Sequence, residues 1–90
     1  MDPTVVINER VDVIATYKRQ GDIGSLCTPY RLRWRGQDIE LTELALRHPT
    51  VQGKRMIHVF HVSDGANGYR LEFDAEGLTW TLVAMIAGQS

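Results

Sequence analysis

The sequence predicts an all-β protein: a compact antiparallel meander of about six strands, curled into a small SH3-like or related barrel. Apolar and polar residues alternate with a period of two along Val11–Lys18, Tyr30–Arg35 and Tyr69–Asp74, which is the pattern of half-buried strands. Short runs containing Gly, Asp and Asn separate these segments, as hairpin turns require. We expect the meander to curl because closure removes exposed strand edges.

The chain has 90 residues, which is enough for one hydrophobic core and too few for two. We expect a single β domain at residues 9–87, preceded by an N-terminal arm at residues 1–8 and followed by a C-terminal tail at residues 88–90. Residues 19–28, which contain two glycines and a serine, are expected to form a loop.

Gly36-Gln37 marks the first hairpin turn, because two residues with glycine first suit a type II′ turn. Folding the chain there brings apolar residues together on one face and opposite charges together on the other, as stable cross-strand pairs require. The expected pairs are Trp34 with Ile39, Leu32 with Leu41, Arg35 with Asp38, and Arg33 with Glu40.

A second hairpin is expected at Asp74–Gly77, which suits a type I turn closed by a left-handed glycine. The expected pairs are Phe73 with Leu78, Leu71 with Trp80, and Tyr69 with Leu82.

Two local features stay open. Residues 42–48 fit either a bulged strand or one helical turn, and we favour the strand. Residues 55–63 are apolar on both faces, as in a central strand, but their register against the next strand is ambiguous by one residue. His58 is opposite Asp74 in one register and opposite Phe73 in the other.

The charge and cysteine content narrow the function classes. Ten Lys and Arg residues against eleven Asp and Glu residues give a net charge of −1, so there is no general attraction to nucleic acid or an anionic membrane. One cysteine, Cys27, allows no internal disulfide, and no apolar run is long enough to span a membrane. The first residues lack the features of a signal peptide, so we expect a cytoplasmic protein.

Arginines are the most visible candidate for a binding surface. Arg31, Arg33 and Arg35 lie on one face of the expected strand and could follow a nucleic-acid backbone. The alternative, which we favour, is a solvated face neutralised by Asp38 and Glu40 on the neighbouring strand. Arg31 is left without an acid in the expected register, and other arginines could join it in space, namely Arg19, Arg47 and Arg55.

No catalytic, metal or cofactor site is expected. His58 and His61 are three residues apart on a strand, so they point to opposite faces and cannot share a metal ion, and His48 lies on another segment. Cys27 precedes Thr-Pro in a loop with no helix start to lower its pKa, so we expect a small packing residue rather than a nucleophile.

The run Tyr30–Gln37, with its Arg-Trp-Arg-Gly motif, resembles a family of short uncharacterised bacterial all-β proteins. The segments His58–Val62 and Leu71–Trp80 look similar to that family too, so the resemblance covers most of residues 11–86. It implies a compact β domain with no known catalytic residues. Some members of the family are encoded near DNA-repair polymerases, so the resemblance implies a link to nucleic-acid transactions.

We therefore expect a non-enzymatic module that binds another protein or forms a homodimer, since low net charge permits association. The alternative is a nucleic-acid-binding accessory domain that uses the Arg-rich strand. An enzyme is the third and least favoured class.

Overall fold

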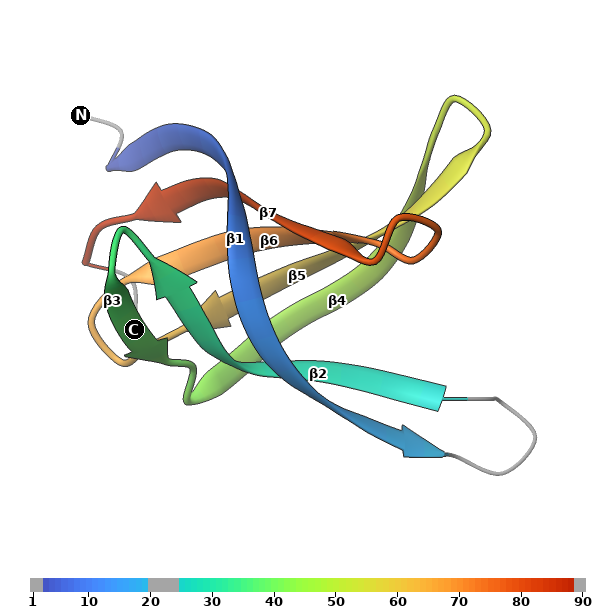
Figure 1. Ribbon diagram of the computed structural model, residues 1–90. Helices are drawn as coiled ribbons and strands as arrows, with labels where there is room; N and C mark the ends of the chain where they lie inside the picture. The colour runs from blue at the N-terminus through green and yellow to red at the C-terminus, as the bar shows by residue number, and fades with distance from the viewer. Residues whose placement is uncertain (1–2, 20–24, 89–90) are drawn as a thin grey trace.

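The protein is all-β and antiparallel, as the sequence predicts. A computed structural model describes residues 3–19 and 25–88, and within these ranges there is no helix (Figure 1). The strands form one seven-stranded sheet in the order β3-β2-β1-β7-β6-β5-β4. Their bounds are β1 Thr4–Arg19, β2 Ser25–Trp34, β3 Gln37–Glu40, β4 Glu43–Gln52, β5 Arg55–Ser63, β6 Gly68–Asp74 and β7 Thr79–Ile86.

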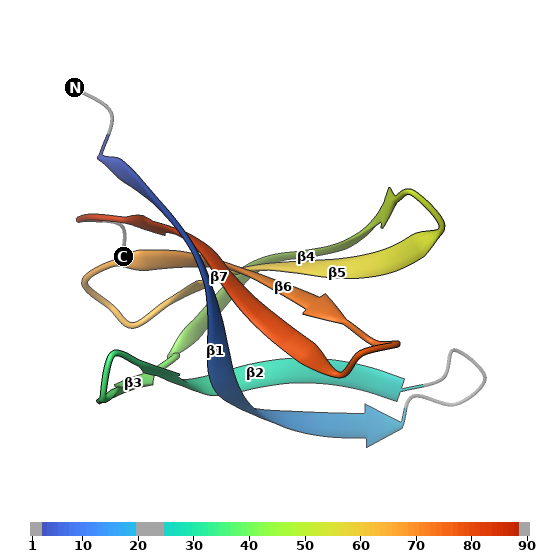
Figure 2. The same ribbon diagram turned by 45° about the horizontal axis from the view of Figure 1, so that its top comes forward.

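Strand β1 changes partner halfway along its length. Residues 4–11 pair with β7, and residues 12–19 pair with β2. Figure 2 shows β1 crossing the molecule, and in the strand order β7, β6, β5 and β4 follow it on one side and β2 and β3 on the other. This strand therefore joins the two halves of the sheet.

The expected barrel is not closed. The edge strands β3 and β4 are joined by Leu41 and Thr42, whose backbone N–H groups donate to Tyr30 O at 2.9 Å and Ser63 O at 2.8 Å. Beyond that connection β4 diverges from β2 (Figure 1). A side chain bridges the opening, because Arg47 on β4 donates to Cys27 O on β2 at 2.7 Å.

Residues 4–8, which we expected in an arm, form the first part of β1. The sheet register shifts between Val6 and Glu9, and Asn8 has a left-handed backbone with φ of 53°. Asparagine tolerates this conformation better than most residues, so it accommodates the bulge. The same bulge interrupts the alternation on which the sequence prediction depended.

The core lies on the concave face of the sheet. Its largest fully buried side chains are Phe60, Leu32, Leu71 and Leu82. The Trp80 ring packs against two phenylalanines, with its centroid 5.4 Å from that of Phe60 and 4.6 Å from that of Phe73. The core thus takes residues from β2, β5, β6 and β7, which explains why the strands curve around it.

The β2–β3 hairpin keeps its expected faces but has a different register. Arg35 and Gly36 both have positive φ, 50° and 77°, as in a type I′ turn, so the turn lies one residue earlier than expected. An even shift of two residues in the pairing leaves every side chain on its face. The observed pairs are Trp34 with Gln37, Arg33 with Asp38, Leu32 with Ile39, and Arg31 with Glu40.

The β6–β7 hairpin differs from the expectation in the same way. Phe73 pairs with Trp80, and Leu71 with Leu82; beyond a register shift between Arg70 and Leu71, Tyr69 pairs with Met85 instead of the expected Leu82. The left-handed residue of the turn is Leu78, with φ of 53°, whereas Gly77 has no positive φ. Asp74 Oδ1 accepts hydrogen bonds from the N–H groups of Glu76 and Gly77, and Asp74 pairs with Thr79, so the turn lies one residue later than expected.

Leu78→Gly is expected to stabilise the protein by about 1 kcal/mol, because a left-handed backbone costs an L-residue roughly that much. The Leu78 side chain is 75% exposed, so its removal loses little burial. Thermal and urea unfolding would measure the change. Gly77→Ala is the matched control and should be neutral or slightly stabilising; a clear loss at Gly77 with no gain at Leu78 would contradict the turn geometry.

The structure resolves the two alternatives that the sequence left open, at residues 42–48 and in the register of residues 55–63. Residues 43–52 form β4, with a register shift between Leu44 and Leu46, so the favoured bulged strand is confirmed. His58 lies opposite Phe73, which selects one of the two registers considered for β5 and β6.

Candidate protein-interaction site: the fork between β1 and β7

Arg31, Arg33 and Arg35, which we call the arginine stripe, are neutralised by acidic side chains of the same chain. Arg31 Nε donates to Glu40 Oε1 at 2.8 Å, and Arg33 Nη1 lies 3.4 Å from Asp38 Oδ1. The acid partners differ from those expected because of the shifted register, and Arg31, expected without one, has Glu40. The stripe therefore offers paired rather than free cations.

Arg35 is held away from the other two arginines. Its Nη2 donates to Glu9 Oε2 on β1 at 2.6 Å, and its guanidinium lies 4.7 Å from the centre of the Trp34 ring. Hydrogen bonds from Arg35 and from the Trp34 indole lower the pKa of Glu9 below its usual value. Arg35 is the first left-handed residue of the β2–β3 turn, and its ion pair with Glu9 holds its side chain in place. We therefore assign Arg35 a structural role.

The remaining candidate arginines do not extend the stripe. Arg55 pairs with Asp74 at 3.1 Å and with Glu76 at 3.3 Å, at the β4–β5 hairpin. Arg47 points to the concave face, where its guanidinium lies 5.6 Å from the Phe60 ring centre and donates to β2. The side chain of Arg19 lies outside the described residues. Among the candidates whose side chains the structure describes, Arg47 and Arg55 thus do not join Arg31, Arg33 and Arg35 in one surface.

Metal and thiol chemistry find no support in the described residues. His48 and His61 lie with ring centroids 6.2 Å apart, but no group of three His, Cys, Asp or Glu side chains in residues 3–19 and 25–88 could hold a metal ion. Burial, with Arg70 and His48 nearby, lowers the pKa of His61. Burial raises the pKa of the Cys27 thiol, so this thiol is not activated at neutral pH.

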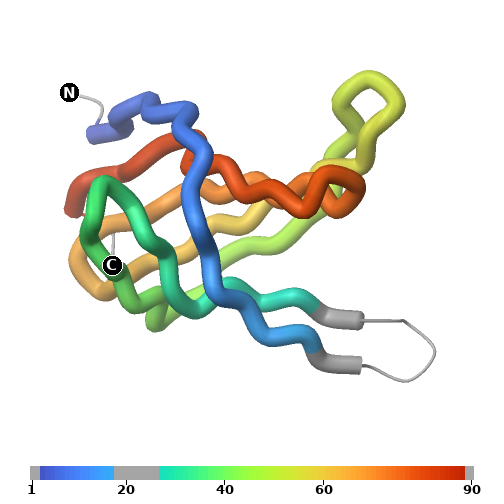
Figure 3. Tube along the Cα trace, in the orientation of Figure 1, coloured from blue at the N-terminus to red at the C-terminus, as the bar shows by residue number. Residues whose placement is uncertain are grey.

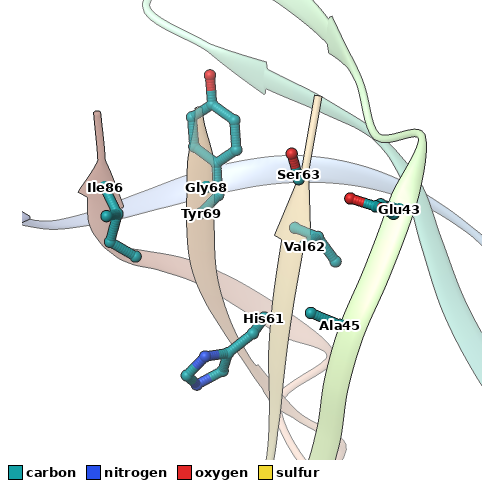
Figure 4. Close-up of a pocket in the computed structure, with 8 residues that line it drawn as sticks. All are labelled: Glu43, Ala45, His61, Val62, Ser63, Gly68, Tyr69 and Ile86. Atoms are coloured by element: carbon teal, nitrogen blue, oxygen red, sulfur yellow. The ribbon is translucent and has the colours of Figure 1, made fainter. Parts of the chain in front are cut away.

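A small hollow of about 150 Å³, lined by residues of β4, β5, β6 and β7, contains residue types used in hydrolases (Figure 4). Glu43, His61 and Ser63 line it, but the His61 imidazole points away from the Ser63 hydroxyl. Ser63 Oγ instead accepts a hydrogen bond from Gly65 N at 3.0 Å, as part of the β5–β6 turn. These residues do not form a nucleophile–base pair.

The most distinctive site lies where β1 separates from β7. Pairing between these strands ends at Val11 and Trp80, after which β1 continues alongside β2 (Figure 3). The separation leaves a groove of about 420 Å³, which we call the fork. Six of its lining residues are apolar or aromatic, namely Val11, Val13, Tyr17, Phe73, Leu78 and Trp80, and Arg10, Asp12 and Thr79 add polar groups.

The fork has buried apolar residues at its base and exposed apolar residues at its opening. Phe73 and Trp80 at its base are each 7% exposed, whereas Tyr17 and Leu78 are 63% and 75% exposed. Tyr17 belongs to β1 and Leu78 to the β6–β7 turn, so these two exposed residues lie on opposite sides of the groove. Exposed apolar groups beside an apolar groove are typical of interaction sites.

The backbone beside the fork has unused hydrogen-bonding capacity. From Asp12 to Arg19, β1 pairs with β2 on one side and with no strand of the described chain on the other. Other free edges carry protective features: the first half of β1, which is free on the side away from β7, is interrupted by the bulge at Asn8, β2 contains Pro29, β4 contains Pro49, and β3 has four residues. Residues 12–19 contain no proline, so this edge can accept a further strand.

Comparison with known proteins adds no assignment, because no family model, curated protein or solved structure matches the chain. No helix capable of crossing a membrane occurs in the part of the chain that the structure describes.

Sequence reasoning missed the fork. It assigned Val11 and Val13 to a strand and Leu78 to a cross-strand pair, but it did not show that β1 exchanges one partner for another. One signal was present: the alternation from Val11 to Lys18 is uninterrupted, and its neighbouring strand was not identified.

Proposed function

We propose that this chain is a non-enzymatic protein-interaction module that accepts an extended polypeptide segment in the fork. The observation that carries the proposal is the unpaired edge of β1 lying beside a groove with an apolar base and a partly polar lining. Strand addition uses these two elements together: main-chain hydrogen bonds supply affinity, and pockets for alternate side chains supply specificity.

The electrostatics support a protein partner over a nucleic acid. Phosphate tracking needs cations that are free to replace counterions. Arg31, Arg33 and Arg35 each have an acid partner within the chain. The raised pKa of the Cys27 thiol argues against thiol catalysis, and a single cysteine fits a reducing compartment such as the cytoplasm.

The test is a selection of random extended peptides on the immobilised protein, followed by amide hydrogen exchange with the selected peptides. We expect protection of the β1 amides at residues 12–17 and binding that changes little between low and high salt. Leu78→Asp should abolish binding, and aspartate tolerates the left-handed backbone there. Leu46→Asp is the matched control, because Leu46 is exposed on the opposite face.

Labelled single-stranded and duplex oligonucleotides provide the opposing measurement. Oligonucleotide binding that weakens steeply with salt, together with no peptide protecting β1, would overturn the proposal in favour of a nucleic-acid module.

A further inference from the structure

We infer that the segment received by the fork is β1 of a second copy of this chain, paired antiparallel about a two-fold axis at Ala15. The inference rests on the proposed function and names its partner. A two-fold axis perpendicular to the sheet makes the same edge self-complementary, so one surface serves both copies.

The geometry restricts the possible registers. Such an axis continues the concave face of one copy into that of the other, so odd residues meet odd residues and even meet even. An axis at Ala15 uses residues 12–18 of the free edge. It places Val13 opposite Tyr17 of the second copy, Asp12 opposite its Lys18, and Ile14 opposite its Thr16.

Neighbouring registers are less complementary. An axis at Thr16 places Val13 opposite Arg19 of the second copy, an apolar residue against a cation. An axis at Ile14 places Arg10 opposite Lys18, and like charges directly opposite one another destabilise a sheet. It also requires Val11, which is already paired with Trp80. The Ala15 register alone joins an apolar pair with a pair of opposite charges.

The arrangement also covers surface that the single chain leaves exposed. Tyr17 is 63% exposed and Ile14 is 46% exposed, and both lie on the segment that would pair. The Tyr17 ring of each copy would lie against Val13 of the other, at the entrance to the groove floored by Trp80. The second half of β1 diverges from β7 in Figure 1, and no strand of the described chain pairs with it on that side.

Overall charge permits the association. Two copies each with a net charge of −1 repel one another only weakly. The edges formed by β2 and β4 contain Pro29 and Pro49, which oppose pairing there. The unprotected edge of β1 is thus the one that favours contact between copies.

Sedimentation equilibrium on the full chain tests the inference. We expect a reversible monomer–dimer equilibrium in the micromolar range. Asp12→Lys and Lys18→Asp should each weaken dimerisation about tenfold, because each places like charges opposite one another twice across the axis. The double variant Asp12→Lys/Lys18→Asp should restore it, which a merely structural role of either residue would not do. Glu43→Lys, on the exposed start of β4, is the charge-matched control.

Amide hydrogen exchange at high and low protein concentration supplies the second readout, and the folded state of each variant is checked by its thermal unfolding. A chain that stays monomeric while selected peptides still protect residues 12–17 would overturn the inference and leave the proposed function standing. A monomer that binds no peptide would overturn both. A dimer that protects other strands, or that ignores the charge exchange, would overturn the β1 register.

Discussion

Leu71→Ala is expected to lower the free energy of unfolding by about 2–5 kcal/mol, the usual cost of a leucine-sized cavity in a closely packed core. Leu71 is fully buried and lies on β6, between β5 and β7, where it faces Phe60 and Leu82. Strands on both sides hold the backbone, so the cavity cannot collapse easily. The free energy of unfolding of a small domain is about 5–15 kcal/mol in total, so this loss is a large fraction of it.

Urea denaturation followed by circular dichroism measures this change. Leu46→Ala is the matched control, because it removes the same atoms from a side chain that is 48% exposed. We expect its effect to stay within about 1 kcal/mol. Equal losses at the two leucines would show that the concave face is not the core.

Asp64→Ala is expected to cost about 2–4 kcal/mol, because one carboxylate organises the whole β5–β6 turn. Its Oδ1 accepts hydrogen bonds from the backbone N–H groups of Ala66 at 2.8 Å and Asn67 at 2.7 Å. Its Oδ2 accepts a hydrogen bond from the Tyr69 hydroxyl at 2.9 Å. Tyr69 is a core residue, so the variant leaves its hydroxyl poorly satisfied as well.

The effect of Asp64→Ala should depend on pH. Burial alone would raise the pKa of Asp64, but hydrogen bonds from Asn67, Ala66 and Tyr69 outweigh it and hold the pKa below its usual value. A carboxyl group with a lowered pKa in the folded state stabilises the protein above about pH 4 and loses that contribution as the pH falls through the folded pKa. The difference between the parent protein and the variant should therefore shrink in acid.

Denaturation midpoints at several pH values give this profile. Tyr69→Phe removes one of the three hydrogen bonds and is expected to cost less than Asp64→Ala. If the cost of Asp64→Ala were the same at neutral and acid pH, the carboxylate would not be the group that stabilises the turn.

Sequence patterns predicted faces better than registers. Alternation with period two assigned Leu32, Leu71 and Trp80 to the core, and all three are buried. Both registers were wrong by two residues because turn geometry decided them. Arg35 adopts a left-handed backbone together with Gly36, and Leu78 adopts one in place of Gly77, although Arg and Leu rarely take this conformation.

Sequence patterns could not predict the fork, because it depends on contacts between residues that are distant in sequence. Period-two alternation records which side of β1 is buried, but not that the strand pairs with β7 before Asp12 and with β2 from there on. The neutralised stripe was predictable in kind, because Asp38 and Glu40 are close in sequence. The partner of Arg35 was not, because Glu9 reaches it only after β1 has bent across the molecule.

The partner change of β1 also governs how the chain folds. The β1–β2 hairpin closes a short loop and can form early, whereas Thr4 must meet Ile86 and Val11 must meet Trp80, close to opposite ends of the described chain. Pairing between such distant residues costs loop-closure entropy before core packing can offset it. β-Rich domains with these contacts therefore fold in about milliseconds to seconds. On the ribosome, the first half of β1 emerges long before its partner β7 is synthesised, so that apolar segment depends on the last strand for protection from aggregation.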